Sequence, residues 1–153
     1  MTNRASEVIT RLQGKTLATA ESCTGGGIGQ VLTSVPGASN VYKGGIISYC
    51  NEIKHKLLGA SIGTLAEFGA VSAPVAEAMA VGARKALETD IAVSVTGLAG
   101  PSGDEFGNPV GTVFIGYADE KTVLSRQFLF FGDRDAVRKQ AIEAALEFIL
   151  ENA

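Results

Sequence analysis

The amino-acid sequence predicts an α/β fold, a three-layer α/β/α sandwich with a mostly parallel mixed sheet and one antiparallel strand. Short runs rich in β-branched residues alternate with amphipathic helical patterns for most of the chain, which is the order of a parallel sheet covered by helices. Two strand-like runs then follow each other, joined by the polar turn 118–121, and this hairpin adds the antiparallel strand. No repeat or linker divides the chain, so we expect residues 1–153 to form a single domain.

The expected helices share an apolar stripe and a start or stop signal at their ends. Ser72-Ala73-Pro74 opens a long helix, because serine can cap a helix and proline is tolerated in its first turn. Asp133 can cap the final helix in the same way. The expected helices cover residues 6–12, 25–34, 51–59, 72–88 and 133–152.

The expected strands are short and rich in β-branched residues. Residues 91–96 are mostly apolar, which is typical of a strand buried on both faces. Ile46-Ile47 lies in another strand, after a Gly-Gly bend. The expected strands cover residues 16–20, 41–49, 91–96, 110–117 and 122–130.

Composition excludes several classes of protein. The chain has 13 basic and 16 acidic residues, a net charge of −3, which excludes a strongly basic nucleic-acid binder. No apolar run approaches the roughly 20 residues of a membrane span, and residues 1–14 lack the apolar stretch of a secretory signal. Two cysteines, Cys23 and Cys50, are too few for a disulfide scaffold or a structural zinc site. We therefore expect a cytoplasmic protein without nucleic-acid or membrane partners.

The first candidate site is the turn that follows the expected strand 16–20, because ligands bind at the carboxyl ends of strands in open α/β sheets. Ser22 lies just before the backbone amides of Cys23, Thr24 and Gly25 at the start of a helix. Such amides can hold an oxyanion, so Ser22 is a candidate nucleophile and the three amides are candidate substrate donors. The alternative is that Ser22 or Thr24 only caps the helix.

A serine nucleophile needs a base, and the only histidine is His55. On a helical wheel of about 100° per residue, Ile53, Leu57 and Leu58 define an apolar arc that contains Lys54 and leaves His55 outside. Burial disfavours the charged form of a lysine and lowers its pKa, so Lys54 is the candidate general base. The alternative is that Lys54 snorkels, with its stem buried and its ammonium in water.

Further candidates lie near other strand ends. Tyr49 could hydrogen-bond the lysine or the serine, or be a rim aromatic with a wet hydroxyl. The loop 96–103, which contains Gly97 and Gly100, could bring its amides to a phosphate, or be an ordinary tight connection. Arg134 could clamp a phosphate or carboxylate, or pair in solvent with a neighbouring aspartate. We expect Cys23 to be a small packed residue, since no histidine is placed to activate its thiol, and no cluster has metal-ligand spacing.

A set of short motifs occurs in order over nearly the whole chain: 20–26, 44–49, 51–54, 57–59, 69–72, 96–101, 109–113 and 132–134. Taken together, the set resembles the nicotinamide-nucleotide amidase family, also known as the CinA C-terminal-domain family. The resemblance implies hydrolysis of the carboxamide of nicotinamide mononucleotide to nicotinate mononucleotide and ammonia, a step of NAD recycling. The implied partner is a small-molecule substrate, a pyridine mononucleotide, and no cofactor or metal is implied.

The resemblance also implies roles for individual residues. Ser22 matches the family nucleophile, Lys54 its base, Tyr49 the tyrosine that assists the pair, and Arg134 the active-site arginine. It implies a homodimer, and the chain resembles the stand-alone form of the family.

Residues 102–108 depart from the family pattern, which often has more glycine there and a lysine before Pro-Val-Gly. Two alternatives therefore stay open: an amidase for a different pyridine carboxamide, and a non-catalytic nucleotide-binding module. The presence of Ser22, Tyr49, Lys54 and Arg134 argues against the binding module.

Overall fold

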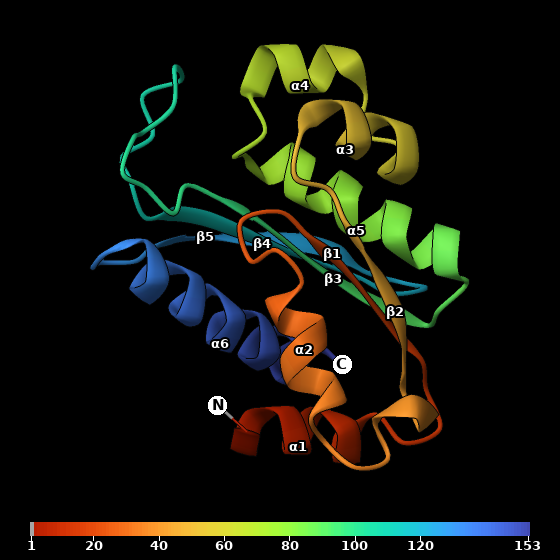
Figure 1. The fold of residues 1–153 in the computed structure, drawn as a ribbon. Helices are drawn as coiled ribbons and strands as arrows, with labels where there is room; N and C mark the ends of the chain where they lie inside the picture. The colour runs from red at the N-terminus through yellow and green to blue at the C-terminus, as the bar shows by residue number, and fades with distance from the viewer. Residues whose placement is uncertain (1) are drawn as a thin grey trace.

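A computed structural model describes residues 2–153 and contains one five-stranded sheet between two layers of helices (Figure 1). The strands lie in the order β2-β1-β3-β4-β5. β1 pairs in parallel with β2 and β3, whereas β4 pairs antiparallel with both β3 and β5. β4 is thus the strand that runs against the others, and the predicted sandwich with a mixed sheet is confirmed. The strands are β1 Leu17–Glu21, β2 Tyr42–Ile47, β3 Ile91–Gly97, β4 Thr112–Ala118 and β5 Val123–Leu129.

The helices divide between the two faces of the sheet, with α1, α2 and α6 on one face and α3, α4 and α5 on the other (Figure 1). Their bounds are α1 Thr2–Arg11, α2 Gly27–Thr33, α3 Asn51–Leu58, α4 Ile62–Phe68, α5 Ala73–Leu87 and α6 Arg134–Asn152, with a short 3₁₀ helix at Ala38–Asn40. Within residues 2–153, no helix combines the length and the apolar character that crossing a membrane requires.

Apolar side chains fill both spaces between the sheet and its helices, which explains why the central strands are buried. Leu17 and Phe148 belong to the core on the α6 side, and Ala18 and Met79 to the core on the α5 side. β3 is buried from Ile91 to Thr96, as its apolar sequence predicts. Burial on both faces leaves only the strand ends free for a site.

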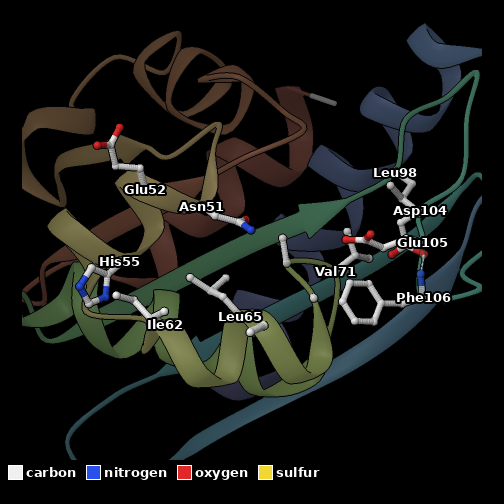
Figure 2. Close-up of a pocket in the computed structure, with 13 residues that line it drawn as sticks. Asn51, Glu52, His55, Ile62, Leu65, Val71, Leu98, Asp104, Glu105 and Phe106 are labelled. Carbon is white, nitrogen blue, oxygen red and sulfur yellow. Dashed lines mark hydrogen bonds between the residues drawn. The ribbon is translucent and has the colours of Figure 1, made fainter.

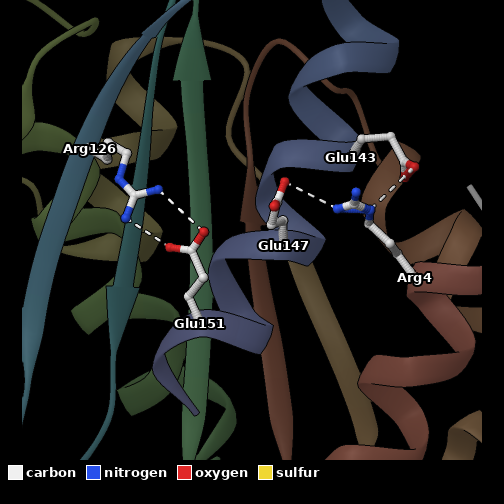
Figure 3. A network of polar contacts seen from close by, with 5 residues as sticks. All are labelled: Arg4, Arg126, Glu143, Glu147 and Glu151. Atoms are coloured by element: carbon white, nitrogen blue, oxygen red, sulfur yellow. Dashed lines mark hydrogen bonds and ion pairs between the residues drawn. The ribbon is translucent and has the colours of Figure 1, made fainter.

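Ion pairs tie α6 to its neighbours at the surface (Figure 3). Arg4 of α1 lies 3.1 Å from the carboxylate of Glu147 and 4.0 Å from that of Glu143. Arg126 of β5 lies 2.8 Å from Glu151. These side chains are substantially exposed, so each pair is worth only about 0–1 kcal/mol of stability. Apolar packing therefore holds α6 in place.

Several local expectations are corrected. The α4 helix was not expected, because it is short, contains Gly63 and buries only Leu65, so it has no apolar stripe. The Ser72 hydroxyl does not cap α5 but donates to the carbonyl of Gly69 (2.8 Å). In contrast, Asp133 caps α6 as expected, accepting the Ala136 amide at 2.9 Å.

Candidate active site

The side chains of Ser22 and Lys54 meet at the carboxyl end of β1. Lys54 Nζ donates to Ser22 Oγ at 2.9 Å and to the Ser48 carbonyl oxygen at 2.7 Å. Ser22 is 8% exposed and Lys54 only 2% exposed, so Lys54 does not snorkel. Desolvation by burial lowers the pKa of Lys54 below its usual value, against a weaker upward effect of Cys50 and Cys23. Burial thereby disfavours the protonated form of this amine.

Helical periodicity turns Lys54 inward. α3 begins at Asn51, and Lys54 and Leu58, one turn apart, are the buried residues of this helix. The prediction that Lys54 faces the protein is confirmed, whereas Leu57, placed in the same apolar arc, is 53% exposed. His55 is exposed as expected, with its Nδ1 2.7 Å from the Ala60 carbonyl oxygen.

Backbone hydrogen bonds fix Ser22 and Lys54 relative to each other. The Ser48 amide donates to the Glu21 carbonyl at 2.7 Å, just after β2, and the Ser22 amide donates to the Val95 carbonyl at 3.0 Å. The Ser48 carbonyl then accepts the Lys54 amine. The serine is thus anchored to β3, and the lysine to the residue that follows β2.

A buried carboxylate that the sequence analysis missed shapes the turn after Ser22. Glu21 is 2% exposed, and its side chain accepts the Thr24 hydroxyl (2.7 Å) and the amides of Gly26 (3.1 Å), Ile28 (2.9 Å) and Gly29 (3.0 Å). Glu21 therefore caps α2 in place of Ser22 or Thr24. An acidic residue a few positions before a glycine-rich helix start was the available signal, since carboxylates stabilise helix N-termini.

The three amides expected to hold an oxyanion are not equivalent. The Gly25 amide already donates to the Ser22 carbonyl at 3.0 Å, which corrects its expected role. Within residues 2–153, the amides of Cys23 and Thr24 have no acceptor on another residue. The carbonyls of Cys23 and Thr24 accept hydrogen bonds from the Arg138 guanidinium, at 3.0 Å and 3.3 Å respectively. Arg138 is a second residue of this region that the sequence analysis missed. Burial raises the pKa of Cys23 to about 11, so its thiol stays protonated at neutral pH.

Arg134 and Tyr49 form the outer wall of the site. Arg134 donates to the Gly100 carbonyl at 2.6 Å and to the Tyr49 hydroxyl at 2.8 Å, and neither contact is to an aspartate. Tyr49 is 61% exposed. Its hydroxyl contacts Arg134 rather than the serine or the lysine, which corrects the expected hydrogen bond.

A cavity of about 290 Å³ collects most of the predicted residues in one place: Ser22, Cys23, Tyr49, Lys54, Gly97, Gly100 and Arg134. Thr24 and Gly25 lie outside its lining, and Thr24 is fully buried. Thr96 and Ser102, from the candidate loop 96–103, also line the cavity, as does Asn51, which was not singled out as a site residue. Within residues 2–153, no group of three or more His, Cys, Asp or Glu side chains is placed to hold a metal ion. The arrangement offers a buried serine–amine pair, free amides and a guanidinium, which together suit acyl transfer on an anionic substrate.

A second cavity, of about 630 Å³, adjoins the first and shares four lining residues with it: Asn51, Ala70, Val71 and Leu98 (Figure 2). It lies between α3, α4 and residues 104–106. Of the segments singled out from the sequence, the candidate loop contributes Leu98 to its lining, and residues 102–108 contribute Asp104, Glu105 and Phe106.

Comparisons with known proteins agree on one family. The family model of the CinA C-terminal domain matches residues 2–153. A protein of Escherichia coli K12 named nicotinamide-nucleotide amidohydrolase PncC is 46% identical over 138 residues, which cover 90% of this chain and 84% of that protein. A CinA-like protein of Petrotoga mobilis is 47% identical over 90% of this chain, but the match covers only 34% of that longer protein.

Solved structures support the same assignment. A CinA superfamily protein from Escherichia coli superposes with a TM-score of 0.97 at 32% identity, over 99% of this chain and 90% of that one. A competence/damage inducible protein from Agrobacterium tumefaciens superposes with a TM-score of 0.94 at 36% identity, over 98% of this chain and 93% of that one. The chain therefore belongs to the CinA C-terminal domain family.

Proposed function

We propose that this protein is an amidohydrolase that converts nicotinamide mononucleotide and water to nicotinate mononucleotide and ammonia, a step of NAD recycling. The observation that carries the proposal is the buried Lys54 amine, 2.9 Å from Ser22 Oγ in the wall of a cavity. The 46% identity to a protein named nicotinamide-nucleotide amidohydrolase supports the choice of substrate.

In the first step, neutral Lys54 accepts the proton of Ser22 while Ser22 Oγ attacks the carboxamide carbon. The Ser48 carbonyl holds one N–H of the amine, so that its lone pair can face the serine hydroxyl. The new C–Oγ bond pushes the carbonyl electron pair onto oxygen, and the amide of Cys23, a residue of the cavity wall, donates to this oxyanion. Proton transfer is direct, because the Tyr49 hydroxyl is engaged by Arg134.

In the second step, protonated Lys54 gives its proton to the leaving nitrogen, the C–N bond breaks and ammonia departs. Water then attacks the acyl-enzyme and gives a proton to Lys54, which returns it to Ser22 Oγ as the ester bond breaks. The products are the carboxylate and ammonium, and the enzyme is restored. We place the substrate phosphate against Arg134, whose planar guanidinium suits a phosphate.

The test is ammonia release from nicotinamide mononucleotide at neutral pH by the parent protein and by the Ser22→Ala and Lys54→Met variants. Removing either member of a nucleophile–base pair costs about 10³-fold or more in kcat. Lys56→Met is the matched control, since Lys56 lies on the same helix but is exposed. The proposal fails if the folded parent releases no ammonia, or if Lys56→Met is as damaging as Lys54→Met.

A further inference from the structure

The second cavity is about twice as large as the first and takes no part in the proposed chemistry. In Figure 2, Leu65 of α4 and the ring of Phe106 extend into the space below Asn51. Asn51 lines both cavities, and its side chain has no hydrogen-bond partner within residues 2–153. The two spaces therefore meet at a polar residue one helical turn before Lys54.

The walls of this cavity favour an aromatic group without negative charge. They carry the apolar side chains of Ile62, Leu65, Ala66, Val71, Leu98 and Phe106. The charged lining residues are Glu52, Asp104 and Glu105, and within residues 2–153 no lysine or arginine lines the cavity. A phosphate would be repelled there, whereas a cation would be attracted. The phosphate of the proposed substrate is therefore assigned to the Arg134 side.

The aromatic wall is held in place by hydrogen bonds within the loop that departs from the family pattern. Asp104 accepts the amides of Phe106 and Asn108, both at 3.0 Å, and the Asn108 side chain at 2.8 Å. Desolvation acts to raise the pKa of Asp104, but these hydrogen bonds outweigh it and lower the pKa, so the carboxylate is charged at neutral pH. Asn108 also donates to the Val71 carbonyl at 3.3 Å, which ties the loop to the start of α5.

Phe106 rests on a residue that has no β-carbon. A side chain at Gly69 would meet the ring within 2.6–2.7 Å, so the ring packs directly on the Gly69 backbone. Phe106 nevertheless stays 43% exposed, and the exposed part is available to a ligand in the cavity. A ring fixed in this way can stack on another aromatic group or lie against a cation.

We propose that the second cavity is a substrate subsite for an uncharged or cationic aromatic substituent of a pyridinium carboxamide. The inference rests on the proposed function and extends its substrate class. The carboxamide lies at Ser22, and the pyridinium ring passes Asn51. When the ring is turned about its bond to the carboxamide, relative to the pose that directs a phosphoribosyl group toward Arg134, the substituent on the ring nitrogen packs against Leu65 and Phe106.

The test compares ammonia release from two cations that carry the same primary carboxamide, the 1-benzyl-3-carbamoylpyridinium and 1-methyl-3-carbamoylpyridinium ions, which differ only in the substituent on the ring nitrogen. Burial of the benzyl ring should make its kcat/KM at least about tenfold higher. Phe106→Ala should bring the benzyl-to-methyl ratio close to one. Phe68→Ala is the matched control, because Phe68 is 44% exposed and lies outside the cavity lining, and it should leave the ratio unchanged.

Charge gives an independent readout if Phe106→Ala fails to fold. The 1-(4-carboxybenzyl)-3-carbamoylpyridinium compound places a carboxylate in the subsite, so its kcat/KM should fall below that of the benzyl compound by about tenfold. Glu105→Gln should recover part of this loss without a change in volume. Equal kcat/KM values for the two benzyl compounds would contradict the inference that the acidic lining residues Glu52, Asp104 and Glu105 disfavour an anion in the cavity.

Failure of the subsite and failure of the proposed function give different results. If nicotinamide mononucleotide is hydrolysed but the benzyl-to-methyl ratio is one, the subsite is wrong and the amidase stands. If no carboxamide is hydrolysed, the amidase is wrong, and calorimetric binding of the two cations tests the subsite directly. Equal affinity for the two cations, or binding of the benzyl cation that Phe106→Ala leaves unchanged, would then overturn the subsite.

Discussion

The carbonyl group of Leu58, at the end of α3, lies directly against Gly82 in the middle of α5, with no room for a β-carbon between them. α3 carries Lys54 one turn before Leu58. This close approach therefore sets how deeply α3 sits on α5, and with it the position of the Lys54 amine relative to Ser22.

Gly82→Ala should lower both activity and stability. The added methyl group would overlap backbone atoms of Leu58, which cannot rotate away, so α3 must shift. A displacement of about 1 Å at a reacting group can cost about 10²-fold in rate, so we expect kcat for ammonia release to fall at least tenfold. Overpacking of this kind costs about 1–3 kcal/mol in the free energy of unfolding, measured in urea.

Gly63→Ala is the matched control for this prediction. Gly63 is also helical, but nothing lies within 4 Å of a β-carbon there. Alanine should therefore stabilise α4 by about 0.5–1 kcal/mol and leave kcat unchanged. Equal activity of the two alanine variants would contradict the idea that contact with Gly82 positions α3.

Glu21 should act as a positioning residue for the nucleophile turn. Glu21→Ala leaves four donors without their acceptor, so we expect a loss of about 3 kcal/mol or more in the free energy of unfolding. Glu21→Gln can keep the three donors on Oε1 and should be intermediate in stability. Because the proposed mechanism uses the Cys23 amide of this turn to stabilise the oxyanion, kcat should fall more than KM rises in both variants. A KM effect alone would assign Glu21 a different role.

Tyr49→Phe distinguishes two roles for the tyrosine hydroxyl. Because the hydroxyl accepts Arg134 and touches neither Ser22 nor Lys54, its loss should raise KM for nicotinamide mononucleotide by about threefold to tenfold through a less well held guanidinium. kcat should change little. A fall in kcat of about 10² or more would instead mean that the hydroxyl relays the proton. Arg134→Ala provides the comparison, because it should raise KM in the same direction but more strongly.

The sequence is informative about the parts of this site that depend on local pattern. Periodicity places Lys54 inside and His55 outside, and the strand-turn-helix order places Ser22 at a sheet edge. Two features depend on contacts between segments that are distant in the sequence, so local sequence patterns do not predict them. Arg138, in the second turn of α6, reaches the carbonyl of Cys23, 115 residues away. The second cavity arises where α4, which has no apolar stripe, packs near residues 104–106.

The fold shows the same division between local and distant information. Strongly apolar or well-capped elements, such as β3 and α6, lie within a few residues of their expected bounds. The cap of α2 was not predicted. The Glu21 carboxylate that provides it precedes the helix by six residues and belongs to β1. Side-chain hydrogen bonds that cross a glycine-rich turn leave no regular residue spacing, so they are hard to predict from a single sequence.

The pH dependence of the reaction should follow Lys54. A neutral amine is required as the base, and burial lowers the pKa of Lys54, so kcat/KM should rise with pH and reach its plateau below pH 10.5, the usual lysine value. Cys23, with a pKa of about 11, stays neutral over this range. His55→Gln is the control and should leave the profile unchanged, because His55 is exposed and lines a different cavity from Ser22. A profile that shifts with His55→Gln would remove Lys54 as the titrating base.

The lowered pKa of Lys54 should also appear in the free energy of unfolding. Between this pKa and the usual value of 10.5, the unfolded chain binds a proton that the folded protein does not. Stability therefore rises with pH across this window, by up to about 1.4 kcal/mol per unit of pKa lowering. Below the window both states are protonated, and the cost of burying the ammonium is fully present. Lys54→Met removes this dependence.

Urea unfolding of the parent protein and of Lys54→Met at pH 7, 8.5 and 10 measures the difference between them. Burial raises the pKa values of Cys23, Tyr42 and Tyr117, so these groups make both proteins less stable as the pH rises. Tyr42 and Tyr117 titrate in parent and variant alike, so their contribution cancels in the difference. Cys23 interacts with Lys54, so both proteins are compared in a Cys23→Ala background. We expect the parent to gain stability relative to Lys54→Met as the pH rises. A difference that stays constant from pH 7 to pH 10 would mean that the buried amine carries its proton throughout, and Lys54 could then not serve as the base.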